Sequence, residues 1–128
     1  MVKERIYLND LHIEHKLWGN ELDFYRDELA ILEPHLEELA NKYTDQELLA
    51  AIEQFQNQFL LQKENIHALR KAINAHESGL AAFAIAHPVA IDHRYFGDHK
   101  DLREKMERER MLYLRLKGDF FAFMDKWM

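Results

Sequence analysis

Residues 11–43 read LHIEHKLWGNELDFYRDELAILEPHLEELANKY, and their apolar side chains recur at alternating intervals of four and three residues. This spacing places one side chain per turn on a single face of an α-helix and is typical of helices that pack in coiled coils. The row, a seam, comprises Leu11, His15, Trp18, Leu22, Tyr25, Leu29, Leu32, Leu36, Leu39 and Tyr43. A second row at Leu17, Phe24 and Ile31 widens the apolar face to what a helix between two neighbours needs. The pattern predicts a helix over about 9–43.

A second seam follows a strong start signal. Thr44 and Glu47 form a capping box, in which each side chain accepts a hydrogen bond from the backbone N–H of the other residue. The following seam comprises Leu48, Ile52, Phe55, Phe59, Gln62, Ile66, Leu69, Ile73, His76, Leu80 and Phe83. We expect a helix over 45–86.

A third seam completes the fold. Pro88 cannot lie inside a helix, so residues 87–97 are expected to form a loop. Asp98 is then expected to cap a helix over 98–127. Its seam comprises Leu102, Met106, Glu109, Tyr113, Leu116, Phe120, Phe123 and Trp127. Residues 1–128 therefore predict one all-α domain, an antiparallel three-helix coiled-coil bundle with long helices.

Composition excludes several classes of site. The chain has 128 residues, of which 48% are hydrophobic, and it has no cysteine. Zinc ribbons, iron–sulfur clusters and thiol nucleophiles are therefore excluded. Glycine-rich phosphate loops and Gly-x-Ser-x-Gly elbows are also missing, so we expect a protein that is not an enzyme.

Charge and hydropathy indicate where the protein acts. The chain carries 17 basic and 23 acidic residues, which give a formal net charge of −6. Because the basic residues are scattered, binding to nucleic acid or to an anionic membrane is not expected. The sequence shows neither a signal peptide nor a membrane-spanning segment, and we expect a soluble, cytoplasmic protein.

The histidines gather at one end of the predicted bundle. The short break near Thr44 predicts an antiparallel hairpin, in which residues whose numbers sum to about 91 face each other. His15 then lies level with His76. Matching Leu80 with Leu102 in the third helix places Met106 in the same layer.

This clustering suggests a metal site. Imidazoles, with nearby carboxylates such as Glu14 and Glu77, bind zinc, iron, nickel or copper. The candidate ligands are His12, His15, His76, His93 and His99. An alternative is that these are hydrogen-bonded core histidines and solvated loop histidines, with no cofactor bound.

Two shorter motifs contain His67. Glu64 and His67 have the Glu-x-x-His spacing of di-iron carboxylate bundles, but only one such pair is present where two are required. The stretch 67–71, HALRK, resembles the phosphotransfer motif of histidine-containing phosphotransfer domains. It departs from that motif at Arg70, where lysine is usual, and at Lys71, which replaces glycine. We therefore expect an ordinary surface histidine.

Apolar side chains also predict a partner surface. The end of the third helix is densely apolar, and neutral amides surround two phenylalanines in the second helix. The predicted interface residues are Phe55, Phe59, Phe121, Met124, Trp127 and Met128. The hairpin is expected to project beyond Trp127 and to expose an apolar tip near Leu39, Tyr43, Leu48 and Ile52.

These observations favour an interaction or scaffold protein that forms a homo-oligomer or binds a partner helix. A metal- or small-ligand-binding protein that uses the histidine-rich end is the alternative. Glu109 is an unusual charge in a seam, and we expect it to bend toward solvent or to pair with Arg70.

Overall fold

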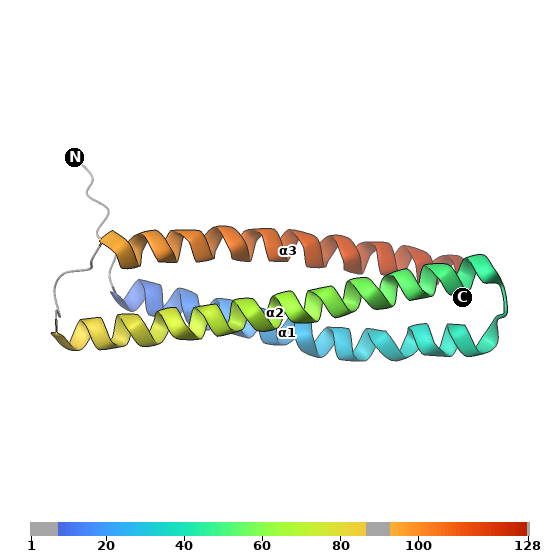
Figure 1. The fold of residues 1–128 in the computed structure, drawn as a ribbon, viewed down its shortest axis with the longest axis horizontal. Helices are drawn as coiled ribbons and strands as arrows, with labels where there is room; N and C mark the ends of the chain where they lie inside the picture. Colours follow the sequence, from blue (N-terminus) through green and yellow to red (C-terminus); the bar gives the residue numbers. More distant parts are fainter. Residues whose placement is uncertain (1–7, 87–92, 128) are drawn as a thin grey trace.

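The computed structural model describes residues 8–86 and 93–127, with side-chain environments given for 10–82 and 98–127. These residues form three long helices: α1 (Leu8–Lys42), α2 (Gln46–Ala86) and α3 (His93–Trp127). Figure 1 shows one elongated bundle in which α1 and α3 run in the same direction and α2 runs in the opposite direction. The predicted all-α three-helix bundle is confirmed. Within the described residues, no helix has an apolar stretch long enough to cross a membrane.

The core follows the three predicted seams. Its largest fully buried side chains come from all three helices: Leu11, Leu22, Leu29, Leu36, Leu48, Phe59, Ile73, His99, Met106, Tyr113 and Phe120. Removing such side chains from water provides the main favourable term in folding. The core is continuous along the bundle, because a buried cluster joins Trp18 near one end to Leu39 and Met124 near the other.

Asp45 starts α2. Its Oδ1 accepts hydrogen bonds from the backbone N–H groups of Glu47, at 2.9 Å, and Leu48, at 3.4 Å. The prediction that Thr44 caps this helix is therefore wrong by one residue. A carboxylate satisfies two free N–H groups and also favours the positive end of the helix dipole.

The predicted start of α3 is also wrong. The helix begins at His93 instead of Asp98, so residues 93–97 of the predicted loop are helical. The rest of that loop, residues 87–92, lies outside the described residues. The shorter connection changes which residues of α3 lie beside α2.

The register of α1 against α2 is as predicted, whereas that of α3 differs by one heptad. The rings of His15 and His76 lie 5.1 Å apart, centroid to centroid. The third member of their layer is His99, 5.7 Å from His76, and not Met106. A shift of seven residues keeps apolar side chains opposite apolar side chains, so the seams alone did not exclude it.

The same shift covers the predicted exposed tip. The ring of Trp127 lies 6.0 Å from that of Tyr43. Leu39, Leu48 and Ile52 are all buried, and Tyr43 alone remains 39% exposed among the four predicted residues. The expected overhang of the hairpin is therefore wrong.

The second apolar row of α1 does not enter the core. Leu17, Phe24 and Ile31 are 61%, 56% and 66% exposed, contrary to prediction. The side of α1 that faces α3 instead uses charged pairs. They are spaced by seven residues and share an offset of 89: Glu14–Arg103, Glu21–Arg110 and Glu28–Lys117. A constant offset requires two parallel helices in one register.

The helices continue through residues that weaken helices. Pro34 lies inside α1, where its ring nitrogen has no hydrogen to donate to the carbonyl four residues earlier. α2 runs without interruption through Gly79, which therefore does not end it. Gly19 contacts α2 closely, because a Cβ atom there would lie 1.9 Å from the Arg70 guanidinium.

Candidate metal centre

Three histidines, one from each helix, meet inside the bundle. His15 on α1 is 3% exposed, His99 on α3 is fully buried, and His76 on α2 is half-buried. Each occupies a seam position or its equivalent, which is why all three side chains point inward. One ring nitrogen from each can be chosen so that all three lie within 4.8 Å of one another.

Two of these rings face each other directly. His15 Nε2 and His99 Nδ1 are 3.0 Å apart. The His99 ring also stacks on Trp18, with centroids 4.9 Å apart and planes inclined by 23°. Trp18 thus covers one side of the cluster with apolar surface.

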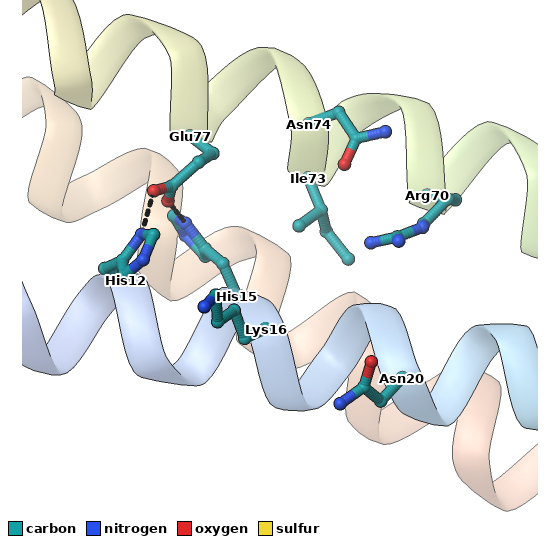
Figure 2. Close-up of a pocket in the computed structure, with 8 residues that line it drawn as sticks. All are labelled: His12, His15, Lys16, Asn20, Arg70, Ile73, Asn74 and Glu77. Atoms are coloured by element: carbon teal, nitrogen blue, oxygen red, sulfur yellow. Dashed lines mark hydrogen bonds and ion pairs between the residues drawn. The ribbon is translucent and has the colours of Figure 1, made fainter.

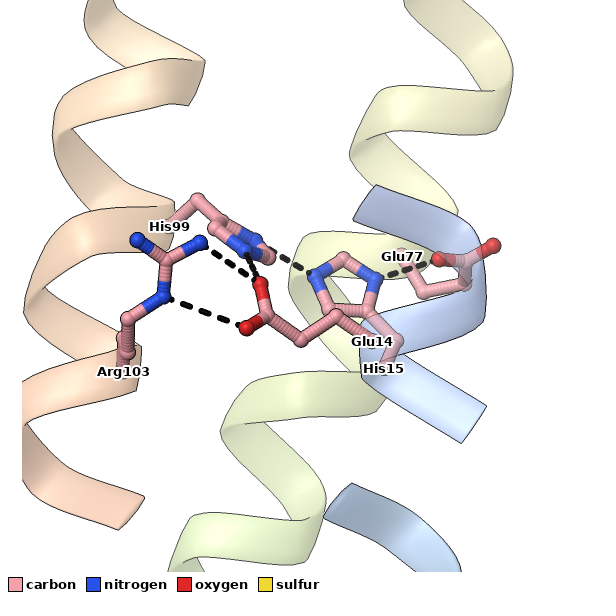
Figure 3. A network of polar contacts seen from close by, with 5 residues as sticks. All are labelled: Glu14, His15, Glu77, His99 and Arg103. Carbon is pink, nitrogen blue, oxygen red and sulfur yellow. Dashed lines mark hydrogen bonds and ion pairs between the residues drawn. The ribbon is translucent and has the colours of Figure 1, made fainter. Parts of the chain in front are cut away.

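Carboxylates bind the outer nitrogens of both rings, as Figure 3 shows. His15 Nδ1–H donates to Glu77 Oε2 at 2.5 Å, and His99 Nε2–H donates to Glu14. Arg103 holds Glu14 in place with hydrogen bonds of 2.8 and 3.2 Å. An ionised carboxylate only accepts hydrogen bonds, so it fixes the proton on the outer nitrogen of each ring.

The two inner nitrogens, His15 Nε2 and His99 Nδ1, therefore face each other without a proton fixed on either of them. With both outer nitrogens protonated, His15 Nε2 and His99 Nδ1 present lone pairs to each other. A metal ion bound by both lone pairs removes this repulsion. Histidines that ligate metals commonly donate their other N–H to a carboxylate in this way.

The pKa shifts of two histidines and two carboxylates in this region favour neutral imidazoles beside ionised carboxylates. Burial raises the pKa of Glu14, but hydrogen bonds from Arg103 and His99 outweigh burial and lower it overall. Burial also raises the pKa of Glu77, but hydrogen bonds from His15 and His12 outweigh burial and lower the pKa overall. Burial lowers the pKa of His76 and His99. Deprotonated imidazole is the form that binds metals.

A groove between α1 and α2 reaches the cluster from one side (Figure 2). Glu77 lies at its end and accepts hydrogen bonds from both His12 and His15. Lys16, Asn20 and Arg70 lie along the rest of the groove.

The structure thus brings together His15, His76 and His99 among the five predicted ligands. The side chain of His12 is 48% exposed, and it forms a hydrogen bond with Glu77 Oε1 instead of joining the cluster. The side chain of His93 lies outside the described residues, as does His87. Glu14 and Glu77 are close by, as expected.

Two contributors were not predicted. Trp18 is a seam residue, and its stacking on His99 follows from the corrected register. Arg103 belongs to the charged row of α3. The seven-residue spacing of Glu14, Glu21 and Glu28 is the signal that identifies its partner.

Two of the six predicted interface residues lie in the core of the single chain, and two more pack against it. Phe59 and Met124 are buried, which corrects their assignment to a partner surface. Phe55 and Trp127 are half-buried against the core. Phe121 is 47% exposed, and Met128 lies outside the described residues.

His67 and Glu64 are exposed on α2, in agreement with a surface role. No protein-family model, curated protein or solved structure matches this chain. Its own residues therefore carry the argument about function.

Proposed function

We propose that this protein binds one divalent transition-metal ion between His15, His76 and His99. The observation that carries the proposal is the pair of inner nitrogens 3.0 Å apart, each on a ring whose outer nitrogen faces a carboxylate. Three nitrogens bound to zinc at about 2.0–2.1 Å lie about 3.3 Å apart in tetrahedral geometry. The three ring nitrogens already lie within 4.8 Å of one another, so side-chain movements of about 1.5 Å or less give that spacing.

The donor set also narrows the choice of ion. Imidazole suits zinc, copper, nickel and iron, whereas calcium and magnesium prefer oxygen ligands. Three protein ligands leave a fourth position for water or another small ligand.

Trp18 provides a local reporter for the experiment. The chain has two tryptophans, and Trp127 lies at the other end of the bundle. In a Trp127→Phe background, Cu²⁺ bound at the histidines should quench Trp18 fluorescence, and Zn²⁺ should compete with one-to-one stoichiometry. Calorimetry with Zn²⁺ at pH 7.5 then gives the affinity.

Matched variants test the assignment. His76→Ala should abolish tight Zn²⁺ binding, whereas His67→Ala, an exposed histidine on the same helix, should leave it unchanged. Glu77→Gln should weaken binding by about 10–100-fold, because a neutral amide replaces the charged acceptor that orients His15. Absence of heat, of quenching and of any rise in Tm would refute the proposal.

A second role, as an interaction protein that forms a homodimer, is favoured by a separate observation. Phe24 and Ile31 on α1 are exposed and flank Glu28, while Leu114 and Phe121 on α3 are exposed and flank its partner Lys117. Residues three or four apart share a helix face, so these four side chains border the same α1–α3 contact. We propose that a second copy of the chain covers them.

Light scattering distinguishes this role. The Phe24→Ser, Phe121→Ser double variant should shift a dimer to monomer. The control replaces Leu60 and Leu61, which are equally exposed on α2, and should remain dimeric. A monomeric wild-type protein at high concentration would contradict this second role.

A further inference from the structure

A second candidate site lies in a groove between α2 and α3. Ala68 and Ala72 form part of its α2 wall, and their small side chains leave space beside α3. Leu69 and Leu112 contribute apolar surface. The groove is separate from the histidine cluster and shares none of its three histidines.

Glu109 places a buried hydrogen-bond acceptor without a donor beside this groove. It lines the groove and is only 5% exposed. Across the described part of the chain, no group donates a hydrogen bond to its Oε1 atom. The expected partner, Arg70, bonds Asp23 at 3.3 Å instead. A buried acceptor without a donor is costly, and a ligand that supplies the donor regains that free energy.

Two cations line the same groove. Lys105 and Arg108 are exposed, and neither forms an ion pair with another described residue. They are available to an anionic group, while the buried carboxylate attracts a cationic one. A buried carboxyl group and two exposed cations therefore line one groove, next to apolar side chains.

We infer that the groove binds a small zwitterion with an apolar side chain, the chemistry of an aliphatic α-amino acid. Its ammonium group donates to Glu109 Oε1, and its carboxylate faces Lys105 and Arg108. The aliphatic part lies against Leu69 and Leu112. Burial raises the pKa of Glu109 to about 7, and an ammonium ion beside it stabilises the charged carboxylate.

The test compares three probes of one shape: L-leucine, isoamylamine, which lacks the carboxylate, and 4-methylpentanoate, which lacks the amine. Ligand-observed NMR and calorimetry should show saturable one-to-one binding of leucine, with either single-charge analogue at least about tenfold weaker. Equal affinity for leucine and isoamylamine would overturn the role of the two cations. No saturable binding of leucine would overturn the inference as a whole.

Variants assign the contacts. Glu109→Gln should weaken leucine binding at least about tenfold, while Glu107→Gln, at an exposed position of α3, should not. Lys105→Ala with Arg108→Ala should weaken leucine binding and leave isoamylamine binding unchanged. Circular dichroism confirms that each variant is folded. Equal losses in the Glu107 and Glu109 variants would refute the site.

Discussion

Glu21 on α1 and Arg110 on α3 form a bidentate ion pair, with N–O distances of 2.6 and 2.8 Å. The hydrogen bonds from Arg110 lower the pKa of Glu21. Tyr25 also donates to the same carboxylate. The pair is the middle member of the charged row that fixes α1 and α3 in parallel register.

We expect a double-mutant cycle on Glu21→Gln and Arg110→Gln to give a coupling of about 0.5–1 kcal/mol, because the pair is partly exposed. Chemical denaturation at low salt measures it. The coupling should shrink at 1 M salt. Coupling that is zero at both salt concentrations would show that the pair does not hold the register.

The cap of α2 provides a second prediction. Asp45→Ala should lower the free energy of unfolding by about 0.5–2 kcal/mol, since two backbone N–H groups lose their acceptor. Thr44→Ala is the matched control and should cost less. A larger loss for Thr44→Ala would restore the capping box predicted from the sequence.

Gly118 offers a stabilising change. A Cβ atom there would meet nothing within 4 Å, and the residue lies inside α3. Gly118→Ala should therefore raise the free energy of unfolding by up to about 1 kcal/mol through helix propensity. Thermal denaturation measures the gain, and a lower Tm would contradict the continuous helix.

Acid should destabilise the metal-free protein through its buried histidines. Burial lowers the pKa of His76 and His99 below the ordinary 6.5. Below about pH 6.5 the unfolded chain therefore binds more protons than the folded chain, and stability is lost as the pH falls. We expect Tm in EDTA to fall between pH 7 and pH 5, and to fall less in His76→Phe. His35→Ala, at an exposed position, should keep the wild-type slope.

Glu109 should change the stability of the protein with pH in the opposite direction to the histidines. Burial raises its pKa from 4.5 to about 7, so the folded chain holds a proton that the unfolded chain releases. Its contribution to stability is full below about pH 4.5 and is lost as the pH rises to 7. Glu109→Gln should gain on the wild type over this range, by about 2 kcal/mol. An advantage that does not change with pH would refute the buried state of this carboxyl group.

The sequence specified the first hairpin well because the break between α1 and α2 is short. His15 and His76 faced each other in the prediction, and their rings do so in the structure. The sequence determines the position of α3 less well, because a heptad pattern matches equally after a shift of seven residues. The predicted connection between α2 and α3 is also five residues too long. The constant offset of 89 residues in the charged row that includes Glu21 and Arg110 identifies the correct register of α3.

The candidate metal site was only partly predictable for the same reason. Correct register in α1 and α2 identified two of its histidines, while the heptad error placed Met106 where His99 lies. The burial of Glu109 could not be foreseen, since its expected partner Arg70 had an alternative carboxylate in Asp23.

The position of His15 also determines where the bundle opens. Residues 43–45 join α1 to α2 at one end of the bundle, and His15 lies toward the other end. There α1 is held by contacts of His15 with Glu77 and His99, and of Glu14 with Arg103. Acid protonates His99, whose burial disfavours the charged ring and lowers its pKa. In acid, the initial turns of α1 should fray first, and their amide hydrogens should exchange with solvent before those near Leu36.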